Sequence, residues 1–201
     1  MKKIFIRKTA LITGLSIFIH SIAQAEIPLP YGWYVEGNAG QSQLSNKSYA
    51  DASSTKNTGF GWNVNAGYKF MTFFAMEMGY TNYYHTNIEA PSGSTAVQDN
   101  HYSYQIDLKG IWPIVDSGAE LFAKLGATHI KSMVSITNTT AANSISLVRS
   151  SHTGGGLFFG LGGDYNFTPQ FAVNAQWTQA NGNSGTGNLS LYSVGLSYLF
   201  G

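Results

Sequence analysis

Apolar and polar residues alternate along eight stretches of the chain. These are residues 31–43, 58–70, 72–85, 101–113, 119–132, 153–167, 169–180 and 188–200. In the second stretch Phe60, Trp62 and Val64 alternate with Gly61 and Asn63. A period of two indicates a β-strand with two different faces. Eleven residues at about 3.3 Å each, tilted by about 40°, would rise roughly 28 Å, which matches the apolar belt of a membrane barrel.

The links between these stretches alternate in length. Short links fall at residues 70–72, 114–118 and 168–169, whereas polar links rich in Ser, Thr, Asn and Gly fall at 44–57, 86–100, 133–152 and 181–187. Such compositions favour turns and loops. The pattern predicts an antiparallel up-and-down barrel of eight strands, with its short turns and both barrel termini at one end.

Two eight-stranded barrels fit this pattern, and they place the apolar face differently. A secreted lipocalin turns it inward, whereas a membrane barrel turns it toward lipid. The second face of the stretches carries small residues, which suit a narrow lumen better than a water-facing surface. They are Gly40, Gly61, Gly67, Ala75, Gly79, Gly126, Gly160 and Gly162.

Aromatic residues on the apolar face fall into two groups when the strands are threaded up and down. The group nearer the short turns is Trp33, Tyr68, Phe70, Phe74, Trp112, Tyr165, Phe167, Phe171, Tyr198 and Phe200. The group nearer the long links is Phe60, Trp62, Tyr80, Tyr102, Tyr104, Trp177 and Tyr192. Aliphatic residues lie between them. Aromatic girdles flanking an apolar band are typical of a bilayer, so the membrane alternative is favoured.

The N-terminus changes which residues belong to the fold. A basic start (MKKIFIRK) is followed by a short apolar stretch and Ala23-Gln24-Ala25. This order predicts a secretory signal peptide over residues 1–25 and a barrel domain over 26–201. Cleavage removes four of the 11 basic residues and none of the 10 acidic ones, so the mature charge is 7 − 10 = −3.

Composition excludes several classes of function. A charged fraction of 10% without basic clusters argues against nucleic-acid binding. The absence of cysteine excludes disulfide scaffolds and thiolate chemistry. The histidines at 85, 101, 129 and 152 lack metal-ligand spacing, so no metal and no cofactor is expected.

The opening Gly32-Trp33-Tyr34-Val35-Glu36-Gly37-Asn38-Ala39-Gly40 resembles the first strand of OmpA-type and OmpX-type barrels, including opacity-like proteins. The ending resembles their assembly signal, through Ser193, Gly195, Tyr198 and Phe200. Sequences of that family usually end on the aromatic residue itself, whereas Gly201 follows Phe200 here. The resemblance implies the outer membrane of a Gram-negative bacterium, with both mature termini periplasmic. It also implies contact with lipopolysaccharide, the barrel assembly machinery and periplasmic chaperones, and a structural or surface-interaction role through four extracellular loops.

Charged residues on the second face form the candidate site. We expect an ion-pair network that fills the lumen, as the resemblance also implies. Its members would be Glu36, Glu77, Asp107, Lys109, Lys124 and Asp164. A narrow ion-conducting pore lined by the same charges is the alternative, but eight strands leave a lumen that side chains fill.

An enzyme is the other alternative. His101-Tyr102-Ser103 resembles the His-x-Ser pair of the lipid A 3-O-deacylases, although Tyr104 stands where that family has Asn. A His can activate a Ser when a carboxylate orients it, and the sequence shows no obvious carboxylate beside this pair. We therefore expect a polar lumen rim and no catalysis.

Overall fold

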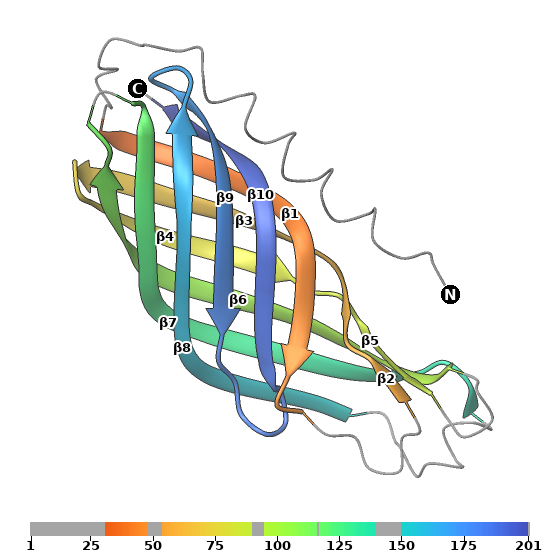
Figure 1. Ribbon diagram of the computed structural model, residues 1–201. Helices are drawn as coiled ribbons and strands as arrows, with labels where there is room; N and C mark the ends of the chain where they lie inside the picture. Colours follow the sequence, from red (N-terminus) through yellow and green to blue (C-terminus); the bar gives the residue numbers. More distant parts are fainter. Residues whose placement is uncertain (1–30, 48–53, 90–94, 116, 140–149, 201) are drawn as a thin grey trace, which may run out of the picture.

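The computed structural model describes residues 31–47, 54–89, 95–115, 117–139 and 150–200. The proposed signal peptide and Gly201 lie outside these ranges. Eight long antiparallel strands enclose a lumen (Figure 1). They are β1 (Gly32–Ser45), β3 (Thr58–Met71), β4 (Phe74–Asn82), β6 (Thr95–Pro113), β7 (Ala119–Ile136), β8 (Ser150–Asn166), β9 (Phe171–Ala180) and β10 (Asn188–Phe200). Among the described residues no helix is long and apolar enough to cross a membrane.

The sheet closes on itself. Going round the barrel, the order is β1, β3, β4, β6, β7, β8, β9 and β10, and β10 pairs again with β1. In this last seam Val35 lies opposite Tyr198, and Ala39 lies opposite Val194. Each of the eight strands therefore has two hydrogen-bonded neighbours, which is what a sheet in hydrocarbon requires. The predicted eight-stranded antiparallel barrel is confirmed.

Regular structure extends further at the long-link end than the sequence predicted. β6 begins at Thr95 and β7 continues to Ile136, and Val97 still pairs with Ile136. Two short strands, β2 (Ser54–Lys56) and β5 (Thr86–Glu89), pair with each other, and β5 also pairs with β6. Polar composition indicated loops here, but hydrogen bonding along an existing ladder extended the strands beyond the apolar belt.

The short connections and the two ends of the described barrel lie at the same rim (Figure 1). β3 and β4 are joined by two residues, and Trp33 pairs with Phe200 near the two chain ends. We call this the terminal rim and the opposite end the long-loop rim. The geometry agrees with an even number of strands.

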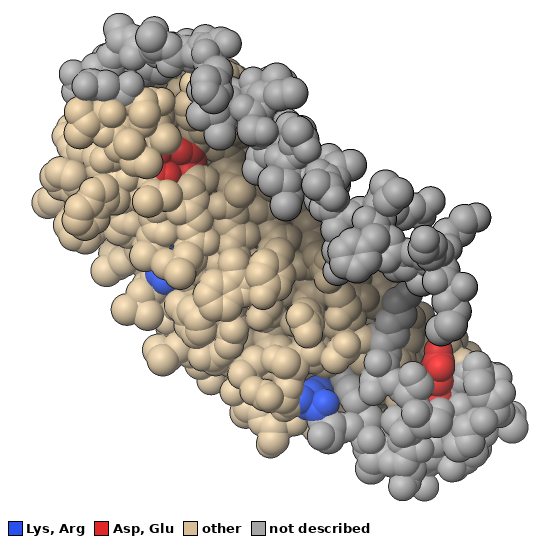
Figure 2. Space-filling view, in the orientation of Figure 1, with Lys and Arg blue, Asp and Glu red and all other residues tan. Residues whose placement is uncertain are grey.

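The apolar face of the strands points outward. Val64, Met78, Leu125 and Val194 are each at least half exposed, although they lie in the middle of their strands. Figure 2 shows one side of this surface, on which charged side chains are visible at only a few places. An outward apolar band is the membrane arrangement and the reverse of a lipocalin.

Ring contacts link the aromatic residues within each predicted group. At the terminal rim Trp33 contacts Tyr68, and Tyr198 contacts both Phe171 and Phe200. Toward the long-loop rim Tyr80 contacts Trp62, Tyr102 and Tyr104. Trp177 likewise contacts Phe159 and Tyr192. We call the rings toward the long-loop rim the outer aromatic group; they are Trp62, Tyr80, Tyr102, Tyr104, Phe159, Trp177 and Tyr192.

Two glycines explain how polar side chains fit into the lumen. A Cβ at Gly67 would collide with the Tyr34 ring, and one at Gly79 would collide with the Asn65 and Gln105 side chains. Glycine at these positions lets large inward side chains lie directly against the opposite stretch of backbone. The small second face is thus the space that the larger lumen residues occupy.

Candidate functional site

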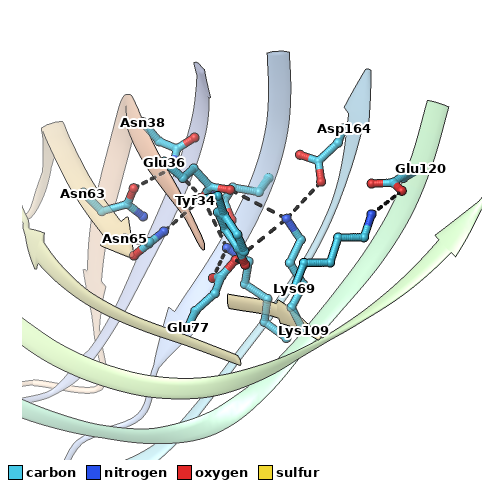
Figure 3. Close-up of polar contacts among 12 residues, drawn as sticks. Tyr34, Glu36, Asn38, Asn63, Asn65, Lys69, Glu77, Lys109, Glu120 and Asp164 are labelled. Atoms are coloured by element: carbon cyan, nitrogen blue, oxygen red, sulfur yellow. Dashed lines mark hydrogen bonds and ion pairs between the residues drawn. The ribbon is translucent and has the colours of Figure 1, made fainter. Parts of the chain in front are cut away.

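Five charged side chains meet in the middle of the lumen (Figure 3). Lys109 Nζ lies 2.9 Å from Asp164 Oδ2, 3.7 Å from Glu36 Oε2 and 3.8 Å from Glu77 Oε1. Lys124 Nζ lies 2.7 Å from Glu77 Oε2 and 3.2 Å from Glu36 Oε1. All five side chains are nearly inaccessible to solvent. We call Glu36, Glu77, Lys109, Lys124 and Asp164 the lumen network.

The lumen network spans the barrel from wall to wall. Glu36 comes from β1 and Lys124 from β7, which are four places apart among eight strands. Lys109 comes from β6, and Glu77 comes from the neighbouring β4. An ion pair between opposite walls fixes the cross-section of the barrel as well as local side-chain positions.

Neutral donors complete the environment of the two glutamates. Glu36 Oε1 accepts hydrogen bonds from the amides of Asn38 (2.8 Å), Asn65 (2.9 Å) and Gln176 (2.8 Å). The Tyr34 hydroxyl donates to Glu77 Oε1 at 2.5 Å. Glu36 Oε2 has no hydrogen-bond partner among the described residues and faces Lys109 Nζ at 3.7 Å. Hydrogen-bond donors and nearby cations together offset the cost of burying the two carboxylates.

Asp107 departs from the expected network. Its side chain is buried opposite Glu77 and Gly126, but neither of its carboxylate oxygens has a hydrogen-bond partner among the described residues. The structure therefore brings together five of the six expected residues and places the sixth beside them without a direct polar contact.

A second ion pair lies nearer the terminal rim, and the sequence analysis did not find it. Lys69 Nζ on β3 lies 3.0 Å from Glu120 Oε1 on β7. With Tyr34, Lys109 and Asp164 these residues line a cavity of about 50 Å³. The sequence signal was available, because Lys69 and Glu120 both fall on the inward phase of their strands, but their relative height depends on strand register.

An apolar layer crosses the lumen on the long-loop side of the network. It consists of Leu44, Tyr83, Ile130, Phe158, Ala180, Leu189 and Leu191, which are all buried and form one cluster. Its position is clear on β7, where Ile130 lies between Lys124 of the network and Ser132 near the mouth. The sequence analysis expected only small or paired residues in the lumen, so this layer is a correction.

A polar cluster lies beyond that layer, at the mouth of the barrel. Lys47, which follows β1, reaches across to Asp99 on β6 (Nζ–Oδ2, 2.6 Å) and Ser132 on β7 (Nζ–Oγ, 2.8 Å). Ser132 donates to Asp99 Oδ1 at 2.6 Å. These contacts tie the segment after β1 to the opposite wall. We call Lys47, Asp99, His101 and Ser132 the mouth cluster.

The mouth cluster lies outside the stretch between the two aromatic groups, which we take as the membrane-spanning part. Burial raises the pKa of Asp99, but His101, Lys47 and Ser132 outweigh that effect and hold it below its ordinary value. Burial lowers the pKa of His101 to about 4, so this side chain is neutral at pH 7.

The His-x-Ser pair is enclosed within the barrel. His101 and Ser103 are 1% and 0% exposed, whereas Tyr104 on the alternate face is 55% exposed. His101 Nε2 lies 3.5 Å from Asp99 Oδ2, so a carboxylate does stand beside the histidine. The sequence analysis missed it, although Asp99 is in phase with His101. The Ser103 hydroxyl forms its hydrogen bond with the Tyr83 hydroxyl, at 3.2 Å.

The four residues of the expected assembly signal all lie on β10. Ser193 points into the lumen and Gly195 lies two residues further along. Tyr198 and Phe200 belong to the aromatic cluster of the terminal rim. Leu199, which interrupts the alternation in the sequence, packs against buried Tyr34, Ala75 and Ile111 and so closes the lumen end. The role of these four residues in assembly stays a prediction.

Solved structures share this architecture. Neisserial surface protein A (NspA) is similar with a TM-score of 0.60 and 19% identity, over 84% of this chain and 97% of NspA. OprG from Pseudomonas aeruginosa gives a TM-score of 0.61 and 12% identity, over 87% and 99%. Ail, the attachment invasion locus protein of Yersinia pestis, gives 0.55 and 19%, over 85% and 99%. At these identities the likeness concerns the fold.

The family comparison covers nearly the whole sequence. No curated protein sequence matches the chain. The family model described as outer membrane protein beta-barrel domain matches residues 10–200. Together with the closed barrel and its outward apolar band, this match assigns the chain to the outer membrane protein beta-barrel family.

Proposed function

We propose that this protein is a sealed, non-enzymatic barrel of the outer membrane that contributes to envelope integrity and presents its long loops to the exterior. The observation that carries the proposal is the filling of the lumen. An apolar layer containing Phe158 and Ile130 lies across it, above a fully buried ion-pair network. Ions would have to cross both.

The apolar layer argues against the ion-conducting alternative. Its one polar side-chain atom is the Tyr83 hydroxyl, which is hydrogen-bonded to Ser103, so the layer offers little to replace the hydration shell of an ion. Phe158, Ile130, Leu189 and Leu191 are each 1% exposed or less. Hydrophobic constrictions of this kind exclude water and ions. The charges of the network also bind one another, so they are not free to line a path.

The orientation follows from the connections. Barrels of the bacterial outer membrane place short turns in the periplasm and longer loops outside. In this orientation the terminal rim, with the first and last residues of the described barrel, faces the periplasm. The mouth cluster faces the exterior. NspA is by name a surface protein, and Ail is by name an attachment protein solved with a heparin analogue. A surface-interaction role through the loops is consistent with the names of these two structurally similar proteins.

Bilayer recordings test the sealed lumen. We expect no sustained ohmic conductance from the purified protein in planar bilayers, since neither the apolar layer nor the paired charges leave a continuous polar path. Replacing Phe158 with Ala, which opens the apolar layer, is the informative companion variant. Steady single-channel currents from the unmodified protein would reject the proposal in favour of a narrow porin.

Unfolding experiments test the network as a structural element. Glu77→Gln should lower the free energy of unfolding by about 3 kcal/mol, because it leaves Lys124 and Lys109 with less compensation in a buried site. Urea titration of the barrel in lipid vesicles, followed by tryptophan fluorescence, measures this. Met78→Leu, on the outward face of the same strand, is the matched control and should change little. Equal midpoints for Glu77→Gln and the control would contradict a stabilising network.

Lipid A analysis tests the enzyme alternative. His101 belongs to the buried mouth cluster and Ser103 is buried two residues further along β6. Both side chains point into the barrel, whereas the outward Tyr104 faces the acyl chains of the membrane. We therefore expect unchanged lipid A mass spectra from cells that produce the protein. Loss of one acyl chain that Ser103→Ala abolishes would establish a deacylase instead.

A further inference from the structure

Lys131 is exceptional among the charged residues of the eight barrel strands. The other nine charged side chains on these strands are all buried in the lumen. They are Glu36, Lys69, Glu77, Asp99, Asp107, Lys109, Glu120, Lys124 and Asp164. Lys131 instead lies on the outward face of β7, between the outward residues His129 and Met133. A cation on the lipid-facing side of a barrel is costly near the bilayer centre and tolerated near the interface.

The surroundings of Lys131 indicate an interfacial position. Tyr102 lies opposite it on β6, and the Lys131 ammonium is 6.0 Å from the centre of that ring. Tyr104 lies opposite His129 in the same way. Among the described residues Lys131 forms no ion pair. Its charge is therefore available at the level of the outer aromatic group.

His129 extends the polar site along the strand. Two residues on the same face of a strand are separated by about 7 Å, so the imidazole and the ammonium stand next to each other. On the other side, the outward positions of β8 opposite them are Gly155 and Thr153. A Cβ at Gly155 would meet only the Thr128 carbonyl, at 3.6 Å, so there is open space beside His129. Tyrosines on one side and small residues on the other form a notch around the two side chains.

An apolar groove begins at this notch and runs toward the bilayer centre. Its volume is about 700 Å³, and its walls include Tyr80, Tyr104, Met78 and Ile106. The short side chains of Ala66 and Ala127 form depressions on either side of Met78 and Ile106, in a single row across four strands. His129 lies at the end of the groove nearest the long-loop rim.

We propose that the notch and groove bind one lipid A molecule of lipopolysaccharide, with a phosphate on Lys131 and His129 and an acyl chain along Ala127. Charge complementarity selects an anionic headgroup, and the adjoining groove selects a lipid over a soluble anion. The choice of lipid A over a phospholipid rests on the proposed orientation, which places Lys131 in the outer leaflet. The site lies on the outside of the barrel and does not depend on a sealed lumen.

Binding measurements with defined lipids test the site. The probe is bis-phosphorylated lipid A added to the purified barrel in detergent, with bound lipid counted by native mass spectrometry. Lys131→Gln should weaken binding about tenfold, because a charge-assisted contact with phosphate is lost. Lys131→Arg should restore it. Gly155→Trp keeps the charge but fills the notch, and it should also weaken binding; heat-modifiable gel migration verifies that each variant is folded.

Two lipid controls make the outcome decisive. Lipid A without its phosphates should bind the unmodified barrel about as weakly as bis-phosphorylated lipid A binds Lys131→Gln, and phosphatidylglycerol should compete poorly. Equal binding by Lys131→Gln and the unmodified protein, no effect of removing the phosphates, or equal competition by phosphatidylglycerol would each overturn the proposal. Orientation is checked separately by labelling Ser184→Cys on intact cells with a membrane-impermeant maleimide, and conductance by bilayer recordings, so failure of this site is distinguishable from failure of the proposed function.

Discussion

Closure of the backbone hydrogen-bond ladder is the constraint on which the rest of this structure depends. In hydrocarbon an unpaired N–H or C=O group costs several kcal/mol, so the first and last strands must pair, as β1 and β10 do. With eight strands the resulting lumen is only wide enough for side chains. This sets two requirements at once: inward positions must be small where the opposite wall is close, and every inward charge needs a partner inside the barrel.

The lumen meets those requirements in layers, with Asp107 as an exception, because its carboxylate has no hydrogen-bond partner among the described residues. Near the terminal rim, Lys69 pairs with Glu120 beside a small apolar cluster that includes Leu199. The lumen network follows, then the apolar layer around Phe158, and then the mouth cluster. The cross-lumen contacts of Glu36 with Lys124 and of Lys47 with Asp99 each join β1 or its continuation to the far wall. Charge and apolar packing therefore stabilise the same cross-section at different depths.

The outer surface of the barrel differs from the lumen in its charge. Its side chains face lipid, so charge is almost excluded. On the eight barrel strands as the structure describes them, the one outward charge is Lys131, and it lies where the outer aromatic group marks an interface. A position that breaks the pattern of its own face is the strongest pointer to a ligand in a molecule of this type, because nothing in the packing of the barrel requires it.

The sequence carried most of the fold because a period of two is visible residue by residue. Phe60 to Phe70 and Tyr192 to Phe200 indicated both the strands and their outward faces, and the small residues opposite them indicated a narrow lumen. Side-chain pairings across the lumen were harder to predict from the sequence. Lys69 and Glu120, or Lys47 and Asp99, are neighbours only because of strand tilt and register, which the alternation does not encode. The apolar layer was missed for the same reason: Phe158 and Leu191 each look like isolated irregularities until the strands are aligned.

The central claim is that the apolar face of every strand meets lipid while the alternate face fills the lumen. Because the chain contains no cysteine, single nitroxide labels can be introduced along β10 at Ser193, Val194, Leu196 and Ser197. Power-saturation electron paramagnetic resonance in lipid vesicles then measures collisions with oxygen and with a water-soluble nickel complex. The account predicts high oxygen accessibility at Val194 and Leu196 and low accessibility to both reagents at Ser193 and Ser197. High oxygen accessibility at the serines, or no alternation along the strand, would contradict it.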